Sequence, residues 1–264
     1  MNEPRDSDLR GLKSQPREPR PSPPDAPDLA HSALFLDIDG TLINLAERHD
    51  AVLVPADTRS LVNDLYTDTK GATALVSGRR IADIDRFFPG FEGVVIASHG
   101  AERRENGELW QHPAKGGLDL VLLTRMARIW AENAPGVLLE EKPCSVVLHF
   151  RQAPGKMADG LKFMQYIADH ADGFTLHRAK MAVEIRPEDV SKRRAVERLI
   201  ERWPSRRPIA CGDDLTDEGM FEVVNRLGGH SIKIGGGGTC ARFRLAGPRE
   251  LTDTLRGWLE ERQQ

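Results

Sequence analysis

Short apolar runs alternate with amphipathic segments along the first third of the chain that follows residue 30. The runs are bounded by polar or turn-forming residues, as buried strands are. We expect strands at residues 33–36, 72–76 and 93–97. Between them, apolar residues recur at helical spacing, and we expect helices at residues 55–68 and 81–87. Strands that alternate with helices predict a parallel sheet with helices on both faces.

The pattern changes between residues 113 and 187. An amphipathic segment followed by two strand-like runs occurs twice in succession. We expect helices at 118–132 and 156–170, and strands at 137–141, 145–151, 174–177 and 182–186. This order is typical of an α+β unit, and we expect residues 113–187 to be inserted into the α/β domain.

The alternation of apolar strand-like runs with amphipathic helical segments resumes after residue 187. We expect helices at 191–202, 219–224 and 252–260, and strands at 208–211 and 230–234. The core domain would then consist of residues 31–112 and 188–264. The glycine run at 235–238 lacks the Gly-x-x-x-x-Gly-Lys-Ser/Thr pattern of a phosphate loop, so we expect a flexible loop near the edge of the core. Cys211 is expected to be a buried strand residue.

Residues 1–30 differ from the rest, because they are rich in Pro, Arg, Asp and Ser and have little apolar content. Such a segment cannot bury enough surface to offset its loss of entropy on ordering. We expect a disordered tail without a part in catalysis. A partner-binding or regulatory segment is the alternative.

Composition narrows the functional classes. The 264 residues carry a formal net charge of −3, which gives no basic excess for nucleic acid. No apolar run approaches the ~20 residues that cross a bilayer, and no secretory h-region is present. The three cysteines show no zinc spacing and form no disulfide framework. We therefore expect a cytoplasmic monomer without nucleic-acid or membrane partners.

The most informative segment is residues 34–42, which read Leu-Phe-Leu-Asp-Ile-Asp-Gly-Thr-Leu. Side chains at i and i+2 of a strand share a face, and the turn that follows lets Asp37 and Asp39 converge. Two like charges so close together repel, and a compensating cation or a shared proton is needed near a core. A polar strand end with an ordinary turn is the structural alternative.

Three further polar clusters follow the same plan. Ser77 follows the second predicted strand, Lys192 begins a helix, and Asp213 and Asp214 follow a late strand with Asp217 close behind. Taken singly, a turn serine or a solvated lysine would explain them. The strand-end groups meet at one edge of a parallel sheet, where ligands bind. Together the clusters supply a carboxylate nucleophile, an acid–base group, Mg²⁺ ligands and a cation for phosphate.

The ordered motifs resemble those of the haloacid dehalogenase (HAD) superfamily of phosphohydrolases. The motifs are Asp37-Ile-Asp-Gly-Thr, Ser77-Gly-Arg, Lys192 and Gly212-Asp-Asp. A narrower resemblance is to the trehalose-6-phosphate phosphatase family. It is carried by Asp83 after Ser77-Gly-Arg, Ser98-His-Gly-Ala-Glu, Glu140-x-Lys142-Pro-x-Ser145, His149-Phe-Arg151, Glu184-Ile-Arg-Pro187 and Gly212-Asp-Asp-x-Thr-Asp-Glu218. The chain departs from that pattern at Ser191, where asparagine is frequent, and at Arg193-Arg194, where glycine is frequent.

The resemblance implies a Rossmann-like HAD core and a role for each matched residue. Asp37 would attack phosphorus, and Asp39 would act as general acid and then as general base. Contacts to the phosphoryl group would come from Thr41, Ser77, Gly78 and Lys192. Mg²⁺ would be held by Asp37, Asp213, the backbone carbonyl of Asp39 and, as support, Asp214.

The same resemblance makes the inserted unit a mobile cap that closes over a sugar phosphate. Disaccharide hydroxyls would be contacted by Glu140, Lys142 and Glu184, with Arg186, His149 and Arg79 as further candidates. From the residues alone, Glu140, Lys142 and Glu184 could equally form a solvated sheet face. The implied reaction is hydrolysis of trehalose 6-phosphate. Alternatives are another sugar phosphate such as sucrose 6-phosphate or a mannosylglycerate phosphate, a phosphomutase reaction, or a non-catalytic sugar-phosphate sensor.

Overall fold

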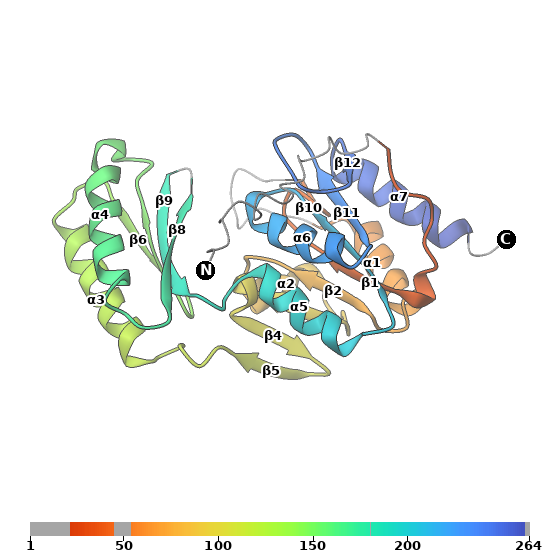
Figure 1. Cartoon of the computed structure of the whole chain (residues 1–264), viewed down its shortest axis with the longest axis horizontal. Coiled ribbons are helices and arrows are strands. Elements are labelled where there is room, and N and C mark those ends of the chain that lie inside the picture. Colours follow the sequence, from red (N-terminus) through yellow and green to blue (C-terminus); the bar gives the residue numbers. More distant parts are fainter. Residues whose placement is uncertain (1–21, 45–53, 180, 262–264) are drawn as a thin grey trace, which may run out of the picture.

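Two units, each with its own β-sheet, make up the protein in the computed structural model (Figure 1), which describes residues 22–44, 54–179 and 181–261. The larger unit contains an eight-stranded sheet in the order β12-β11-β10-β1-β2-β3-β4-β5. Neighbouring strands from β12 to β3 pair in parallel. These strands are β1 (Ser32–Leu36), β2 (Thr73–Val76), β3 (Val94–Ala97), β10 (Arg207–Gly212), β11 (His230–Ile234) and β12 (Phe243–Leu245).

Helices cover both faces of the larger sheet. One face packs against α1 (Ala56–Asp68), α2 (Ile81–Phe87) and α7 (Pro248–Glu261), and the other against α5 (Lys192–Arg202) and α6 (Glu218–Arg226). Alternate residues of β1 point to the two faces: Leu34 and Leu36 join the first core, and Phe35 joins the second. All five β1 residues are buried, which explains why the strand reads as an unbroken apolar run.

The smaller unit is an antiparallel sheet covered by two helices. Its elements are α3 (Leu118–Glu132), β6 (Leu138–Glu141), β7 (Val146–His149), α4 (Met157–Ala168), β8 (Phe174–Ala179) and β9 (Ala182–Pro187). The strand order is β6-β7-β9-β8, and α3 and α4 lie on the side away from the larger unit (Figure 1). The structure confirms the predicted α/β core with a mostly parallel sheet and the predicted inserted α+β unit.

The face of the smaller sheet that the helices leave uncovered carries a row of polar side chains. Glu140 and Glu184 are both register partners of Val147, and His177 is the partner of Glu184. Because directly opposed residues share a face, Glu140, Glu184 and His177 stand in one line across the sheet, and Val147 is the apolar member of that line on β7. Neighbouring positions such as Leu148, Val183 and Ile185 point the other way into the helix-covered core.

Three strands of the larger unit are not in the sequence prediction, namely β12 and a pair of strands at the opposite edge of the sheet. Strands β4 (Glu102–Glu105) and β5 (Glu108–Gln111) form a hairpin that extends the sheet antiparallel to β3. Their residues are mostly charged, so the apolar runs do not reveal them, although Asn106-Gly107 is a hairpin turn sequence. The last helix begins at Pro248 rather than at residue 252, because proline is well suited to the first helical turn.

The start of the chain is more ordered than expected from residue 22 onward. Leu29 is buried in the larger core and begins a short 3₁₀ helix, Leu29–His31, whose N-cap is Asp28. Residues 1–21 of the predicted tail lie outside the described residues. Among the helices that are described, none is both long and apolar enough to span a membrane.

Candidate active site

The loop after β1 brings Asp37 to the carboxyl edge of the sheet. Asp37 is 4% exposed, and the Thr41 hydroxyl donates to its Oδ2 atom at 3.0 Å. Gly40 has a φ of +73°, a conformation that glycine adopts without strain. A Cβ atom at Gly40 would lie 2.1 Å from Oδ2 of Asp213. Glycine therefore lets the loop after β10 approach the loop after β1.

Lys192 supplies the countercharge at the start of α5. Ser191 is the N-cap, and its hydroxyl accepts from the backbone N–H of Arg194 at 3.2 Å. The Lys192 Nζ atom lies 2.7 Å from Oδ1 of Asp37 and 2.7 Å from Oδ1 of Asp217, and the residue is 3% exposed. Burial lowers the pKa of Lys192, but the two carboxylates outweigh it and raise the pKa overall, so the lysine stays charged.

The two departures from the family pattern leave this lysine in place. Serine replaces asparagine as an equally good cap, since both side chains accept a backbone hydrogen bond. Arg193 pairs with Glu197 and Glu222, and Arg194 pairs with Glu197, on the outer surface of the helix.

Asp217 organises the loop after β10. Its Oδ2 atom accepts the backbone N–H groups of Asp213 at 2.9 Å and of Asp214 at 3.0 Å. Asp214 turns the other way, and its Oδ1 atom accepts from the N–H of Thr216 at 2.7 Å in a capping box. Asp217 therefore orients the Lys192 ammonium as well as the loop.

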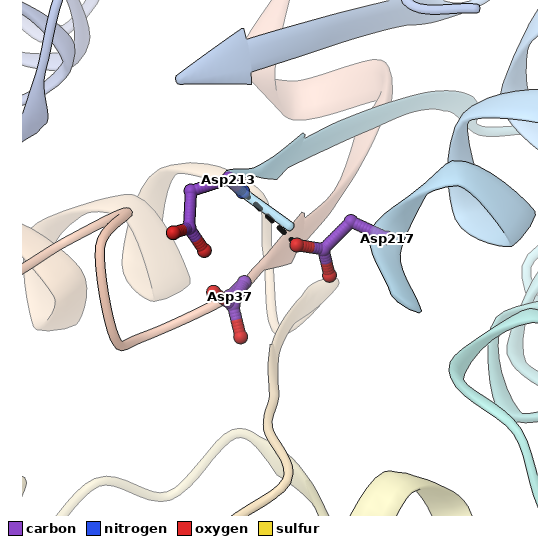
Figure 2. A group of neighbouring side chains, drawn as sticks. All are labelled: Asp37, Asp213 and Asp217. Carbon is purple, nitrogen blue, oxygen red and sulfur yellow. Dashed lines mark hydrogen bonds between the residues drawn. The ribbon is translucent and has the colours of Figure 1, made fainter. Parts of the chain in front are cut away.

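Asp37, Asp213 and Asp217 form a cluster of carboxylates (Figure 2). Each offers an oxygen within 4.8 Å of those of the other two. Burial raises the pKa of Asp37 to about 6, partly opposed by Lys192. Burial and the charges of Asp217 and Asp214 raise the pKa of Asp213 to about 6, and burial raises that of Asp217 to about 7. Excess negative charge and clustered oxygens suit a hard divalent cation.

The carboxylate cluster contains Asp217, which was not among the expected metal ligands, and does not contain Asp214, which was expected only as support. Asp39 was expected to contribute its backbone carbonyl, so its side chain was not expected in the cluster. The spacing Gly212-Asp-x-x-x-Asp217 contains Asp217, but only the turn Leu215–Asp217 (η5) shows that it folds back under Asp213.

Asp39 is held by an arginine rather than by the carboxylate cluster. Arg79 Nε lies 2.5 Å from Oδ2 of Asp39, and Arg79 Nη2 lies 2.6 Å from Oδ1. The guanidinium also stacks 4.7 Å above the centre of the Phe87 ring, and its side chain is 9% exposed. This bidentate pair, which the periodicity of strands and helices does not indicate, fixes the direction of the Asp39 carboxylate.

The expected phosphate-binding hydroxyls lie next to this pair of loops. Thr41 is fully buried beside Asp37, and Ser77 is 1% exposed at the end of β2, the neighbour of β1 in the sheet. The Ser77 Oγ atom accepts from the backbone N–H of Arg79 at 3.1 Å. Gly78 follows Ser77 in the same loop.

The charged residues expected to bind sugar occupy two environments. Glu184 is largely shielded, since its Oε1 accepts from Ser145 at 2.6 Å and from Lys142 at 3.4 Å, while Arg186 lies 3.8 Å from Oε2. Burial raises the pKa of Glu184, but Lys142 and the Ser145 hydrogen bond outweigh it, so the pKa is lowered overall. Glu140 is more exposed and pairs with His149 at 2.8 Å.

Side chains of both units line a small cavity. Ser98 and His99 from the larger unit face Lys142, Glu184 and Arg186 from the smaller one, around a space of about 10 Å³. That is room for about one water molecule, whereas pockets for small ligands usually measure about 300–1,000 Å³. A molecule of the size of a disaccharide therefore does not fit in this cavity.

Two polar contacts lie near the segments that link the two units, and the second of them crosses from one unit to the other. The His112 Nε2 atom lies 2.9 Å from Oδ1 of Asp189, which joins the segment that leaves the larger unit to the segment that returns. The Arg80 side chain donates to the backbone carbonyl of Glu141 at 3.1 Å.

The family model of trehalose-phosphatases matches residues 35–240. A probable trehalose-phosphate phosphatase of Sinorhizobium fredii is 41% identical over 212 residues, which are 79% of each chain. The trehalose-6-phosphate phosphatase of Escherichia coli is 36% identical over 240 residues, 89% of this chain and 88% of that protein.

Solved structures are also similar to this chain. A trehalose-6-phosphate phosphatase related protein matches with a TM-score of 0.71 at 28% identity, over 88% of this chain and 99% of that one. A haloacid dehalogenase-like hydrolase from B. subtilis, at 16% identity, shares the fold with a TM-score of 0.62 over 85% of this chain and 99% of its own. The chain is a phosphatase that belongs to the trehalose-phosphatase family.

Proposed function

We propose that this protein hydrolyses trehalose 6-phosphate to trehalose and inorganic phosphate through an aspartyl-phosphate, with Mg²⁺ as cofactor. The observation that carries the chemistry is a buried carboxylate, Asp37, paired with Lys192 and facing Asp213 at the carboxyl edge of the sheet. The substrate is inferred from the names of the two relatives at 41% and 36% identity.

In the first step the Asp37 carboxylate attacks phosphorus, and the bond from phosphorus to the sugar oxygen breaks. Asp37 becomes an acyl phosphate, and the sugar oxygen leaves with a proton from Asp39. Lys192, Thr41 and Ser77 would hold the phosphoryl oxygens, and the charge of Lys192 would offset the negative charge of the transition state.

In the second step water displaces the Asp37 carboxylate from phosphorus. Asp39, now deprotonated, takes a proton from the water, whose oxygen attacks phosphorus and releases phosphate from Asp37. Each Asp39 oxygen accepts one hydrogen bond from Arg79, so a proton on Asp39 would occupy a lone pair that the guanidinium leaves free.

Asp37 and Asp213 are the residues that we expect to hold Mg²⁺, with the backbone carbonyl of Asp39. Both oxygens of Asp217 already accept protein hydrogen bonds, so this residue would position Lys192 and the Asp213 loop instead. The ion would neutralise charge on the nucleophile and on the phosphoryl oxygens.

Metal binding should depend on pH in a direction that follows from the raised pKa values. Between about pH 4 and pH 7 the folded cluster keeps protons that the unfolded chain releases, so the metal-free protein should lose stability as pH rises through this window. Added Mg²⁺ should therefore raise the Tm more at about pH 7.5 than at about pH 5, where protons compete. Thermal unfolding with and without Mg²⁺ at both pH values measures this.

The matched control for that experiment is Asp213→Asn. This variant should lose most of the Mg²⁺-dependent rise in Tm at the higher pH. An equal rise at both pH values in the wild-type protein would show that the cluster does not bind the ion.

Residues 113–187 are proposed to act as a cap that opens for the sugar phosphate and closes over it. The support is the cavity of about 10 Å³ and the row of polar side chains on the face turned toward the larger unit. Closure would exclude bulk water from the site, and Glu184 and Lys142 would contact sugar hydroxyls.

Glu184→Gln should lower kcat/KM for trehalose 6-phosphate by about 100-fold, because a charged acceptor of hydroxyl hydrogen bonds is lost at similar side-chain volume. The same variant should change kcat/KM for p-nitrophenyl phosphate by less than about 3-fold, since the small substrate does not reach the smaller sheet. Steady-state kinetics on both substrates decide this. Glu132→Gln, at an exposed position of α3, is the control, and equal losses on both substrates would remove Glu184 from sugar recognition.

Phosphate release from a panel of sugar phosphates, with and without Mg²⁺, tests the whole proposal. We expect the highest kcat/KM for trehalose 6-phosphate. A higher value for sucrose 6-phosphate or a mannosylglycerate phosphate would reassign the substrate, and binding without turnover would favour the sensor. The monomeric state and the cytoplasmic location stay predictions.

A further inference from the structure

The loop after β3 has an unusual backbone. Ser98 and His99 have φ values of +49° and +57°, although neither is glycine. Such residues in the left-handed region are strained and persist only where surrounding contacts hold them. Here the N–H of Ser98 donates to the Arg79 carbonyl at 2.7 Å, and the N–H of His99 donates to the Ser77 carbonyl at 3.0 Å. The loop is thus tied to the phosphate-side loop after β2.

The His99 ring lies directly over Gly78. A Cβ atom at Gly78 would be 2.6 Å from both Cε1 and Nε2 of His99. Gly78 is not among the glycines with positive φ, so its backbone conformation does not require glycine. The imidazole of His99 can lie over position 78 because glycine has no side chain there.

The His99 ring has a hydrogen-bonding position that no other described residue uses. Its Nδ1 atom is buried, and within the described ranges it has no hydrogen-bond partner. Most buried polar atoms in proteins have a hydrogen-bond partner, so a buried atom without one indicates a partner that is not part of the protein. The residue borders the small cavity opposite Lys142, Glu184 and Arg186.

The charge state of His99 indicates which partner fits. Burial and the positive charge of Lys192 lower the pKa of His99 to about 3, and Glu184 opposes this only in part. The imidazole is therefore neutral in the physiological range, with one donor and one acceptor nitrogen. A neutral ring adds no charge toward phosphate, but it matches a hydroxyl, which can both donate and accept.

We propose that His99 is a specificity-determining residue that hydrogen-bonds a hydroxyl of the sugar, from the core side of the cavity opposite Glu184 and Lys142. The inference rests on the proposed function and extends it, because it places a sugar contact on the unit that carries out the chemistry. The sugar would then be held from both sides, and the strained loop would serve to aim the ring.

The decisive variant is His99→Gly, because glycine adopts a φ of +57° without strain while removing the ring. Its kcat/KM for trehalose 6-phosphate should fall about 10- to 100-fold, as expected when one hydrogen bond to a sugar hydroxyl is lost. Its kcat/KM for p-nitrophenyl phosphate should stay within about 3-fold of the wild-type value, and its Tm should change little. Asn106→Gly, at φ +50° in the β4–β5 turn, is the matched control and should leave both substrates unaffected.

The outcomes separate this inference from the proposed function. The wild-type protein is first assayed on the panel of sugar phosphates to find the one that it hydrolyses best. His99→Gly and the wild type are then compared on that sugar phosphate and on p-nitrophenyl phosphate. Unchanged selectivity in His99→Gly would overturn the role of His99 alone. Equal losses on both substrates would make His99 a support of the phosphate-side loop, which also overturns it. Absence of turnover on every sugar phosphate by the wild-type protein would overturn both proposals.

Discussion

Asp37→Asn is expected to lower kcat by at least about 10⁴-fold, because an amide cannot form the acyl phosphate. The variant should stay folded. Asparagine has nearly the same size as aspartate and can still accept from the Thr41 hydroxyl, and Lys192 keeps its contact with Asp217. Removal of one carboxylate also relieves repulsion with Asp213, which is one of the causes that raise the pKa of Asp37.

Phosphate release and thermal unfolding, measured side by side, test the assignment. The expected result is no turnover above background on any substrate, with a Tm within a few degrees of the wild-type value. Asp64→Asn, at an exposed position of α1, should be fully active. Near-wild-type turnover by Asp37→Asn would mean that another group attacks phosphorus.

Lys192→Met should affect both activity and stability. The substitution leaves two buried carboxylates, Asp37 and Asp217, without the ammonium that each contacts at 2.7 Å. Removing one partner of a buried ion pair costs about 3–5 kcal/mol of unfolding free energy. We also expect kcat to fall about 10³-fold, since the group that offsets transition-state charge is lost. Denaturant unfolding and steady-state kinetics measure the two losses.

The stability loss in Lys192→Met should shrink as pH falls. Without the lysine, the carboxylates of Asp37 and Asp217 become harder to ionise in the folded state than in the unfolded chain. The folded protein then holds protons that the unfolded chain releases, so acidification restores part of its stability. Lys192→Met with Asp217→Asn should be more stable than Lys192→Met alone near neutral pH. Lys156→Met, at an exposed position, should change neither property, and a pH-independent deficit would show that packing rather than charge is responsible.

Most of the fold was predictable because its strands are buried on both faces. In β1 and β2 every residue is buried, so each strand appears in the sequence as an unbroken apolar run with a polar cluster directly after it. The β4–β5 hairpin lies at the sheet edge and is largely accessible, so its residues obey no such pattern. Its turn, Asn106-Gly107, was the available signal.

A residue of the candidate site could be predicted from the sequence when its place directly after a strand or at the start of a helix brings it to the edge of the sheet. This holds for Asp37, Lys192 and Asp213. The pairs within the site depend on how loops fold back, which strand and helix periodicity does not specify. Asp217 reaches Lys192 only through the η5 turn, and Arg79 reaches Asp39 across 40 residues of sequence. Roles for all of these residues remain to be tested by the variants above.

The cavity of about 10 Å³ also bears on the timing of the reaction. If the smaller unit acts as the proposed cap, a disaccharide would enter and leave only while the two units are apart, so each turnover would include one opening before chemistry and one after it. The aspartyl-phosphate would exist only between these two events. Contacts across the interface, such as Arg80 with the Glu141 carbonyl, would then help to set how long the product is retained.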